Sequence, residues 1–311
     1  LLHASPADGR GYRVLAQLAV DRGDQAAAAR NFRIAAARAP RDLEARAWLV
    51  QDALARGDAE QALLHIDRVL IYAPGAGARL FPLLGTLSAD PAFAKVLSGY
   101  LQRQPAWRGP FLAALQGNRA RDPEALDRVL AGLQEEGGLE GAEFDAWIES
   151  LMQQGRWGEA HARWGSRQVA QGRALPLLYN GDFAQPPTGG GFDWRLRKVA
   201  GLLATVEPGN PGDALRLEFL GRRVAGGPLV EHALLLPPGS YRLTWRERTD
   251  GLRAGAGIRW HVACAGATGL LGEADPTDGT RPWRDRSLAF TVPASGCEGQ
   301  WLRLASPGNA Q

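Results

Sequence analysis

Residues 11–40 read GYRVLAQLAVDRGDQAAAARNFRIAAARAP, and residues 45–74 repeat their pattern as ARAWLVQDALARGDAEQALLHIDRVLIYAP. Five positions match at a constant offset of 34 residues: Gly23 and Gly57, Asp24 and Asp58, Ala28 and Ala62, Phe32 and Ile66, Pro40 and Pro74. A period of this length is typical of a repeated helical hairpin. The pattern predicts a tight turn at each glycine, a helix crossing at each small alanine, and the end of a second helix at each proline.

A third copy lies further along the chain. Ala160 and Trp164 follow Gly155 by five and nine residues, the same spacings that occur in the first two copies. Residues 79–140 keep helical periodicity without this signature, with candidate helices at Pro91–Gln102, Pro110–Gln116 and Pro123–Glu135. We interpret this stretch as degenerate repeats, and a separate helical insert is the alternative.

These offsets resemble the tetratricopeptide repeat family, and the resemblance covers about half of the chain. It implies an α-solenoid whose concave groove contains a peptide or protein partner. In the first helix we expect Leu15, Ala16 and Ala19 to form the inner stripe. We expect polar residues of each first helix to line the partner groove: Arg13, Gln17, Arg46 and Gln51. The same polar residues would also suit a solvated face, and that alternative stays open.

The character of the sequence changes after about Leu175. Helical periodicity gives way to short β-prone segments separated by glycine and proline turns. Six segments have this character: 215–220, 229–236, 241–247, 258–264, 287–292 and 300–304. Their spacing suits a β-sandwich or jelly roll. We therefore expect a multidomain chain, α then β, with a tetratricopeptide-type α-solenoid over residues 1–175 and a β-sandwich over residues 176–311.

Three motifs of the second half, in the order in which they occur, resemble the galactose-binding-like jelly rolls, a group that includes many carbohydrate-binding modules. The motifs are Asn180-Gly181-Asp182-Phe183 followed by Gly191-Phe192-Asp193-Trp194, then Pro238 to Leu243, then Trp283 with Leu288 to Pro293. The resemblance spans about residues 176–311. It implies glycan binding, in which exposed aromatic rings stack on sugar faces and polar side chains bond the hydroxyl groups.

Strand alternation predicts which face would carry such a site. Trp245, Trp260 and Cys264 are expected in the core. The opposite face is expected to carry the glycan-binding residues: Arg246, Arg259, His261, Trp301 and Arg303. Its arginines favour an anionic polysaccharide over a neutral one. In the alternative interpretation, Trp301 packs under a loop or against the helical repeats, and the arginines form a solvated face.

The chain contains two cysteines, Cys264 and Cys297, and both fall in or beside neighbouring predicted strands. We expect a disulfide between them, with two buried thiols as the alternative. A disulfide would imply an oxidising compartment, so we expect a bacterial periplasmic or otherwise extracytoplasmic location.

The sequence contains no motif typical of an enzyme. No zinc-ligand spacing such as CxxC or HxxxH occurs, and the five histidines are scattered. We therefore expect a protein that is not an enzyme and has no cofactor and no metal.

The expected partners follow from the architecture and the charge. A solenoid followed by a carbohydrate-module-like sandwich predicts a scaffold or assembly protein of a bacterial envelope polysaccharide pathway, with a protein partner in the groove and a polysaccharide on the sandwich. A protein-interaction adaptor without a glycan site is the alternative, and an exposed aromatic residue beside Arg and Asp would favour the glycan site.

The net charge is +3 without a long basic run, so nucleic acid is not expected. No membrane span is expected either, and an anchor upstream of Leu1 stays open.

Overall fold

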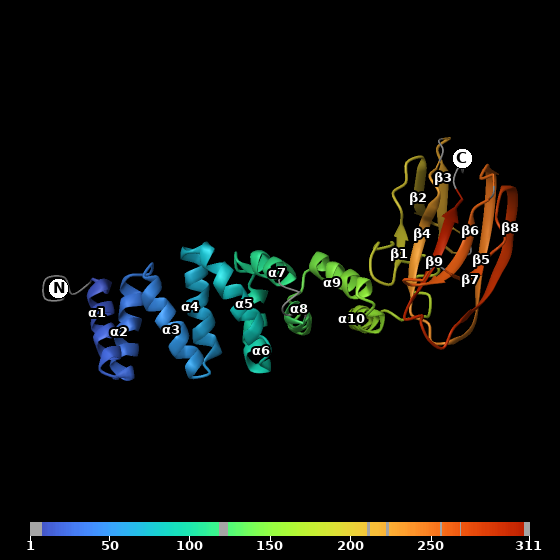
Figure 1. Ribbon diagram of the computed structural model, residues 1–311. Helices are drawn as coiled ribbons and strands as arrows, with labels where there is room; N and C mark the ends of the chain where they lie inside the picture. Colours follow the sequence, from blue (N-terminus) through green and yellow to red (C-terminus); the bar gives the residue numbers. More distant parts are fainter. Residues whose placement is uncertain are drawn as a thin grey trace. The chain divides into compact units, whose positions relative to one another are not determined.

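The computed structural model describes residues 8–117, 124–209, 212–221, 224–255, 257–267 and 269–307 (Figure 1). Helices α1 to α10 come first in the chain and strands β1 to β9 follow them. This order confirms the expected fold class, a helical part followed by an antiparallel β-sandwich. The chain divides into two compact units, Leu1–Phe144 and Asp145–Gln311.

The first unit begins with two helical hairpins that follow the sequence repeat. They are formed by α1 (Gly9–Asp21), α2 (Gln25–Arg38), α3 (Leu43–Ala55) and α4 (Ala59–Tyr72). An aspartate side chain caps the start of each helix by accepting a hydrogen bond from a backbone N–H of the first turn. Gly23 and Gly57 adopt φ of 75° and 70° in the two hairpin turns, a conformation that favours glycine. The predicted turns are therefore confirmed.

The positions that the repeat pattern assigns to the helix crossings are buried. Ala28 and Ala62 are fully inaccessible, and Phe32 and Ile66 lie in the core beside them. The inner stripe of α1 differs from the expectation at one position. Ala16 and Ala19 are buried, but Leu15 is 41% exposed, so its predicted place in the core is wrong. The two alanines, one helical turn apart, are small enough to let α1 approach α2 closely, and Leu15 lies off that stripe.

The remainder of the first unit is also helical. It contains the short helix η1 (Pro74–Ala76), then α5 (Gly77–Leu87), α6 (Pro91–Gln102), α7 (Arg108–Gly117) and α8 (Ala125–Glu135). The expected helix 91–102 occurs with those bounds. Position 123, where the third candidate helix was expected to begin, lies outside the described residues. Within this unit Arg108 is buried and donates hydrogen bonds to the carbonyl oxygens of Leu101 and Gly138, at 2.9 and 3.0 Å.

The second unit contains α10 (Trp157–Ala170) and most of α9 (Gly141–Gln153) together with the sandwich. Gly155 forms the turn between these helices with φ of 78°. Helix α10 ends at Ala170 and the first strand begins at Trp194, whereas the division into compact units comes earlier. The domain boundary at residue 175 stays a prediction.

Among the described residues, the sandwich has nine strands: β1 (Trp194–Leu196), β2 (Leu202–Glu207), β3 (Ala214–Phe219), β4 (Gly227–Leu234), β5 (Gly239–Leu252), β6 (Arg259–Cys264), β7 (Leu270–Glu273), β8 (Gly279–Val292) and β9 (Gln300–Ser306). Five of them form one sheet in the order β1-β4-β9-β6-β7, and β2–β3 and β5–β8 form two-stranded ladders. All pairings are antiparallel. Strands β1, β2 and β7 were not among the six expected segments.

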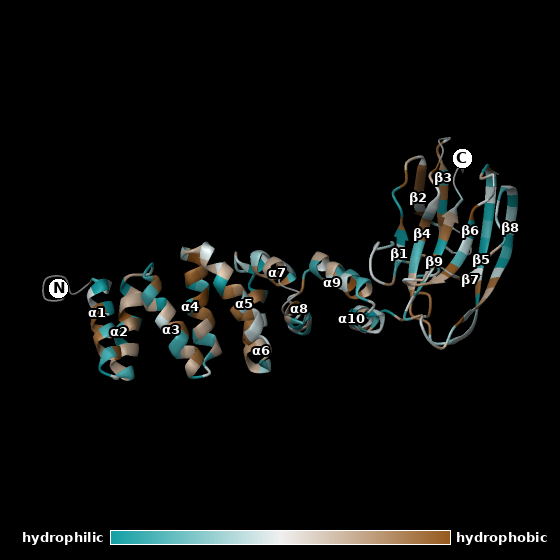
Figure 2. Ribbon diagram, viewed as in Figure 1, coloured by the Kyte–Doolittle hydropathy of each residue, from teal (hydrophilic) through white to brown (hydrophobic). Residues whose placement is uncertain are grey.

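The sandwich core contains side chains from the five-stranded sheet and from the β5–β8 ladder. Val230, Val262 and Leu302 come from the sheet, and Leu288 and Phe290 come from the ladder. Trp245 and Trp260 are partly buried against this core, and Cys264 is buried, as strand alternation predicted. The outward-facing residues make β5 and β8 largely hydrophilic in Figure 2.

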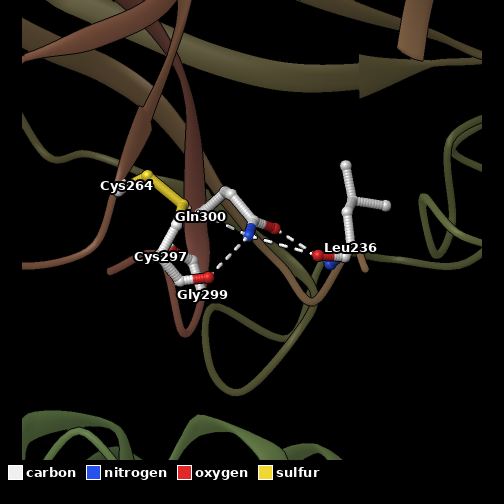
Figure 3. Close-up of a disulfide and its surroundings, with 5 residues drawn as sticks. All are labelled: Leu236, Cys264, Cys297, Gly299 and Gln300. Carbon is white, nitrogen blue, oxygen red and sulfur yellow. Dashed lines mark hydrogen bonds between the residues drawn. A yellow bond between two sulfur atoms is a disulfide. The ribbon is translucent and has the colours of Figure 1, made fainter. Parts of the chain in front are cut away.

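Cys264 and Cys297 form a disulfide with a Cα–Cα distance of 5.1 Å, which confirms the predicted bridge (Figure 3). Gln300 lies beside it and is fully buried. The Leu236 backbone N–H donates to Gln300 Oε1 at 2.9 Å, and Gln300 Nε2 donates to the Leu236 carbonyl at 3.4 Å. The bridge and this amide together tie the start of β9 to β6 and to the segment after β4.

None of the described helices is long and apolar enough to cross a membrane. The described residues also contain no group of three His, Cys, Asp or Glu side chains placed to bind a metal ion.

Candidate functional sites

A concave pocket of about 600 Å³ lies on the first unit between the helices α1 and α3. Helix α1 lines it with Arg13, Val14, Gln17 and Leu18, helix α3 with Glu44, Ala47, Trp48 and Gln51, and helix α2 with Phe32. We call this pocket the α1–α3 groove. Three of the four predicted groove residues, Arg13, Gln17 and Gln51, line it. The sequence repeat brings them together because equivalent positions of successive first helices face the same way.

The α1–α3 groove combines apolar and polar surface. Val14 and Leu18 are 50% and 44% exposed, so the groove presents aliphatic surface to a ligand. The Trp48 indole stacks on Phe32 with the ring centroids 4.6 Å apart. Gln17 and Gln51 add amide groups at positions one repeat apart. Such a surface can bury an apolar side chain and hydrogen-bond the backbone that carries it.

The prediction that Arg46 lines the groove is wrong. Its side chain is buried and its guanidinium donates to the carbonyl oxygens of Pro40 and Ala36, at 2.9 and 3.2 Å. Ala36 lies in the last turn of α2, where backbone acceptors have no partner within the helix, and Pro40 follows the helix. Arg46 therefore joins the second hairpin to the first one. Helical periodicity identified Arg46 as a polar position of α3. It did not predict that the end of the preceding helix would cover this side chain.

Four of the five predicted glycan-binding residues lie together on one face of the five-stranded sheet. Arg303 is directly opposite His261 on one side and Glu231 on the other. Arg259 and Trp301 lie on the same face, because antiparallel partners share a face and residues alternate along each strand. We call this the β4–β9–β6 face.

Most of the charged side chains on the β4–β9–β6 face form ion pairs with one another or with neighbouring side chains. Glu231 is almost completely buried, and it accepts a hydrogen bond from Arg303 Nε at 2.7 Å and contacts Arg197. Arg259 lies 3.4 Å from Glu273. Carboxylates of this protein therefore already bind the guanidinium groups that were expected to bind a glycan. Burial and the neighbouring Arg303 lower the pKa of His261, so its imidazole is protonated less readily than that of an ordinary histidine.

Trp301 packs against a helix. Its ring meets Trp157 of α10 edge to face, with centroids 5.5 Å apart. The guanidinium groups of Arg195 and Arg303 lie over the Trp301 ring, 4.8 and 5.4 Å from its centroid. Arg195 in turn forms a two-bond pair with Glu149 of α9, at 2.6 and 2.9 Å. These contacts correspond to the alternative interpretation, in which the helices cover the indole.

Arg246, the fifth predicted residue, lies on the β5–β8 ladder and not on the five-stranded sheet. It is directly opposite Asp285, with 3.4 Å between Arg246 Nε and a carboxylate oxygen. Its guanidinium and that of Arg248 lie over the Trp283 ring, 5.7 and 5.5 Å from its centroid. Trp283 is 48% exposed. Trp283 lies two residues before Asp285 in β8 and therefore on the same outward face, and the expected strand 287–292 began too late to include it.

No protein-family model matches this chain, and no curated protein matches it. Among solved structures, it is similar to a chain described as "CBM4 structure and function", that is, a carbohydrate-binding module. The sequence identity is 10%, the match covers 43% of this chain and 90% of that chain, and the TM-score is 0.33.

Proposed function

We propose that the chain is a non-catalytic scaffold protein of a bacterial envelope polysaccharide pathway. Its helical repeats, of tetratricopeptide type, bind a segment of a protein partner, and its sandwich binds an anionic glycan. The observation that carries the proposal is the α1–α3 groove. An open concave surface with exposed aliphatic side chains between polar ones is suited to bind a peptide segment.

The chemistry of the groove indicates the kind of segment. Val14, Leu18 and Trp48 offer an apolar surface for one or two aliphatic or aromatic side chains of the partner. Gln17 and Gln51 each offer a donor and an acceptor for its backbone. Arg13 pairs with Asp42 at 3.2 Å and also contacts Glu44, so the rim of the groove presents both charges.

Two observations support the remaining parts of the proposal. An exposed indole with arginines and an aspartate, Trp283 with Arg246, Arg248 and Asp285, favours a glycan-binding sandwich over an adaptor without a glycan site. The disulfide Cys264–Cys297 supports an extracytoplasmic location, because disulfides persist in oxidising compartments. The adaptor remains the second candidate, and it shares the groove.

A peptide-display selection tests the groove. We expect the intact protein to select peptides with a shared apolar residue. The variant Val14→Asp/Leu18→Asp should bind those peptides at least about tenfold more weakly, because two charges would have to be desolvated on binding. Leu64→Asp is the control, since Leu64 is 37% exposed on α4 and lies outside the groove. A selection without a shared motif, or equal binding by the groove variant, would contradict the proposal.

A further inference from the structure

We infer that the anionic glycan binds the outer face of the β5–β8 ladder, around Trp283, and that its charges are carboxylates. This inference rests on the glycan binding in the proposed function and assigns it to a surface that shares only Arg246 with the face expected from the sequence. The surface consists of Arg242, Arg246, Arg248, Trp283 and Asp285, and we call it the Trp283 surface.

Trp283 differs from the other tryptophans of the chain. All ten lie in the part of the chain that the structure describes, and the other nine are buried or half-buried. A ring left 48% exposed retains apolar surface that a ligand can cover. The face of an indole is complementary to the C–H groups of a pyranose ring. Arg246 and Arg248 already lie over this ring, so a sugar that stacks on its remaining exposed surface would lie beside both guanidinium groups, whereas Trp301 is packed on Trp157.

The ladder register extends the site along the strands. Arg246 is opposite Asp285, Thr244 is opposite Ser287, and Arg242 is opposite Ala289. Because alternate residues share a face, Arg242, Thr244 and Arg246 form one row that ends near Arg248. At about 3.4 Å per residue, this row is roughly 20 Å long, enough for several sugar residues. Hydroxyl groups of Thr244 and Ser287 lie between the guanidinium groups.

The charge of the Trp283 surface favours an anionic ligand. It has three guanidinium groups and one carboxylate, and Arg246 is the arginine that pairs with that carboxylate. Arg242 and Arg248 form no ion pair with any residue in the described ranges. On the β4–β9–β6 face, by contrast, Arg259 and Arg303 pair with Glu273 and Glu231. A planar carboxylate matches the two parallel N–H donors of a guanidinium, so a polyuronate is the expected class of glycan.

Affinity electrophoresis and titration calorimetry with polygalacturonate test the inference, with dextran as the neutral polysaccharide. The intact protein should bind polygalacturonate and not dextran, and added salt should weaken the binding because exposed charges are screened. Trp283→Ala should reduce the affinity by about tenfold or more, and Arg248→Gln by about threefold to tenfold. Both side chains are on the surface, so the fold should be unchanged by circular dichroism.

Two matched variants serve as controls. Leu203→Ala removes an apolar side chain with the same 48% exposure from β2, and Arg216→Gln removes one positive charge from an exposed pair on β3. Both should bind polygalacturonate like the intact protein.

If the intact protein binds but Trp283→Ala and Arg248→Gln bind equally well, the site is misassigned and the proposed function stands. If the intact protein binds neither polygalacturonate nor any other polysaccharide tried, the glycan part of the proposed function fails as well. If Trp283→Ala instead changes the oligomeric state and leaves glycan affinity unchanged, the surface binds a second copy of the chain and the inference is overturned.

Discussion

The indole of Trp157 in α10 meets the indole of Trp301 in β9 at 85°, with ring centroids 5.5 Å apart. Trp157 is 4% exposed, and it also packs edge-on against Phe192. The backbone at Gly299 packs directly against the Trp157 ring. A Cβ atom added to Gly299 would lie 2.1 Å from the Trp157 side chain. Helix α10 and the sandwich thus share a packed aromatic contact within the second unit.

The first prediction tests this contact. Trp157→Ala should lower the free energy of unfolding of the second unit by about 3–5 kcal/mol, because it removes a buried indole and leaves a cavity beside Trp301. Urea denaturation followed by far-ultraviolet circular dichroism measures the change. Trp283→Ala is the matched control, and it should cost less than about 1 kcal/mol because that indole is exposed. Equal costs for the two variants would show that Trp157 is not part of the core.

The second prediction concerns the helix crossing of the first repeat. Ala28 is fully buried between α1 and α2, so Ala28→Trp should overfill the crossing and destabilise the first unit by about 1–3 kcal/mol. A thermal melt followed by circular dichroism should show a lower transition temperature. Ala26→Trp places the same side chain on the exposed face of α2 and should leave the melt unchanged. An unchanged melt for Ala28→Trp would contradict the crossing.

The third prediction concerns the disulfide. Replacing both Cys264 and Cys297 with serine should lower the free energy of unfolding by about 2–4 kcal/mol, because the bridge closes a loop with a sequence separation of 33 residues. Thiol titration of the denatured, unreduced protein should detect no free thiol. Since the chain has two cysteines, a result of two thiols per chain would exclude the bridge and remove the support for an oxidising compartment.

The fourth prediction concerns the buried His232. Burial lowers the pKa of His232 from 6.5 to about 4. The carbonyl oxygens of Tyr179 and Ala233, 3.0 and 2.7 Å from its ring nitrogens, offset part of this effect, and Asp193 and Arg195 act in opposite directions. As the pH falls, the His232 imidazole therefore takes up a proton near pH 6.5 in the unfolded chain but only near pH 4 in the folded protein. The stability from the neutral ring is complete above about pH 6.5 and is lost as the pH falls toward about 4.

The size of this effect is about 3 kcal/mol over that window. Urea denaturation at several pH values should show the decline, and the difference in stability between the parent and His232→Gln should become smaller as the pH falls. The imidazole signals of His232 in a nuclear magnetic resonance titration should stay constant down to about pH 5. A midpoint near the ordinary value would refute the prediction.

Several features of this protein follow from local sequence alone. The hairpin turns at Gly23 and Gly57, the buried alanines at Ala28 and Ala62, and the helix caps depend on residues a few positions apart. The same holds for strand positions such as β6 and for the inward orientation of Trp245, because a strand alternates its faces every residue. The disulfide was predictable because only two cysteines exist and both lie in or beside neighbouring strands.

Other features were decided by the tertiary structure. Alternation assigns Arg246 and Arg259 to outward faces, but it does not state that the two strands belong to different layers of the sandwich. Likewise, a polar side chain on a helix can be covered by the end of the preceding helix, as happens to Arg46. An aromatic side chain on a strand can be covered by a helix, as Trp301 is covered by α10. The sequence by itself determined the two helical hairpins of the first repeats, six of the described strands and most of their inner faces, since these depend on local periodicity. Only the tertiary structure decided which outward side chains remain exposed, because that depends on packing between segments far apart in the chain.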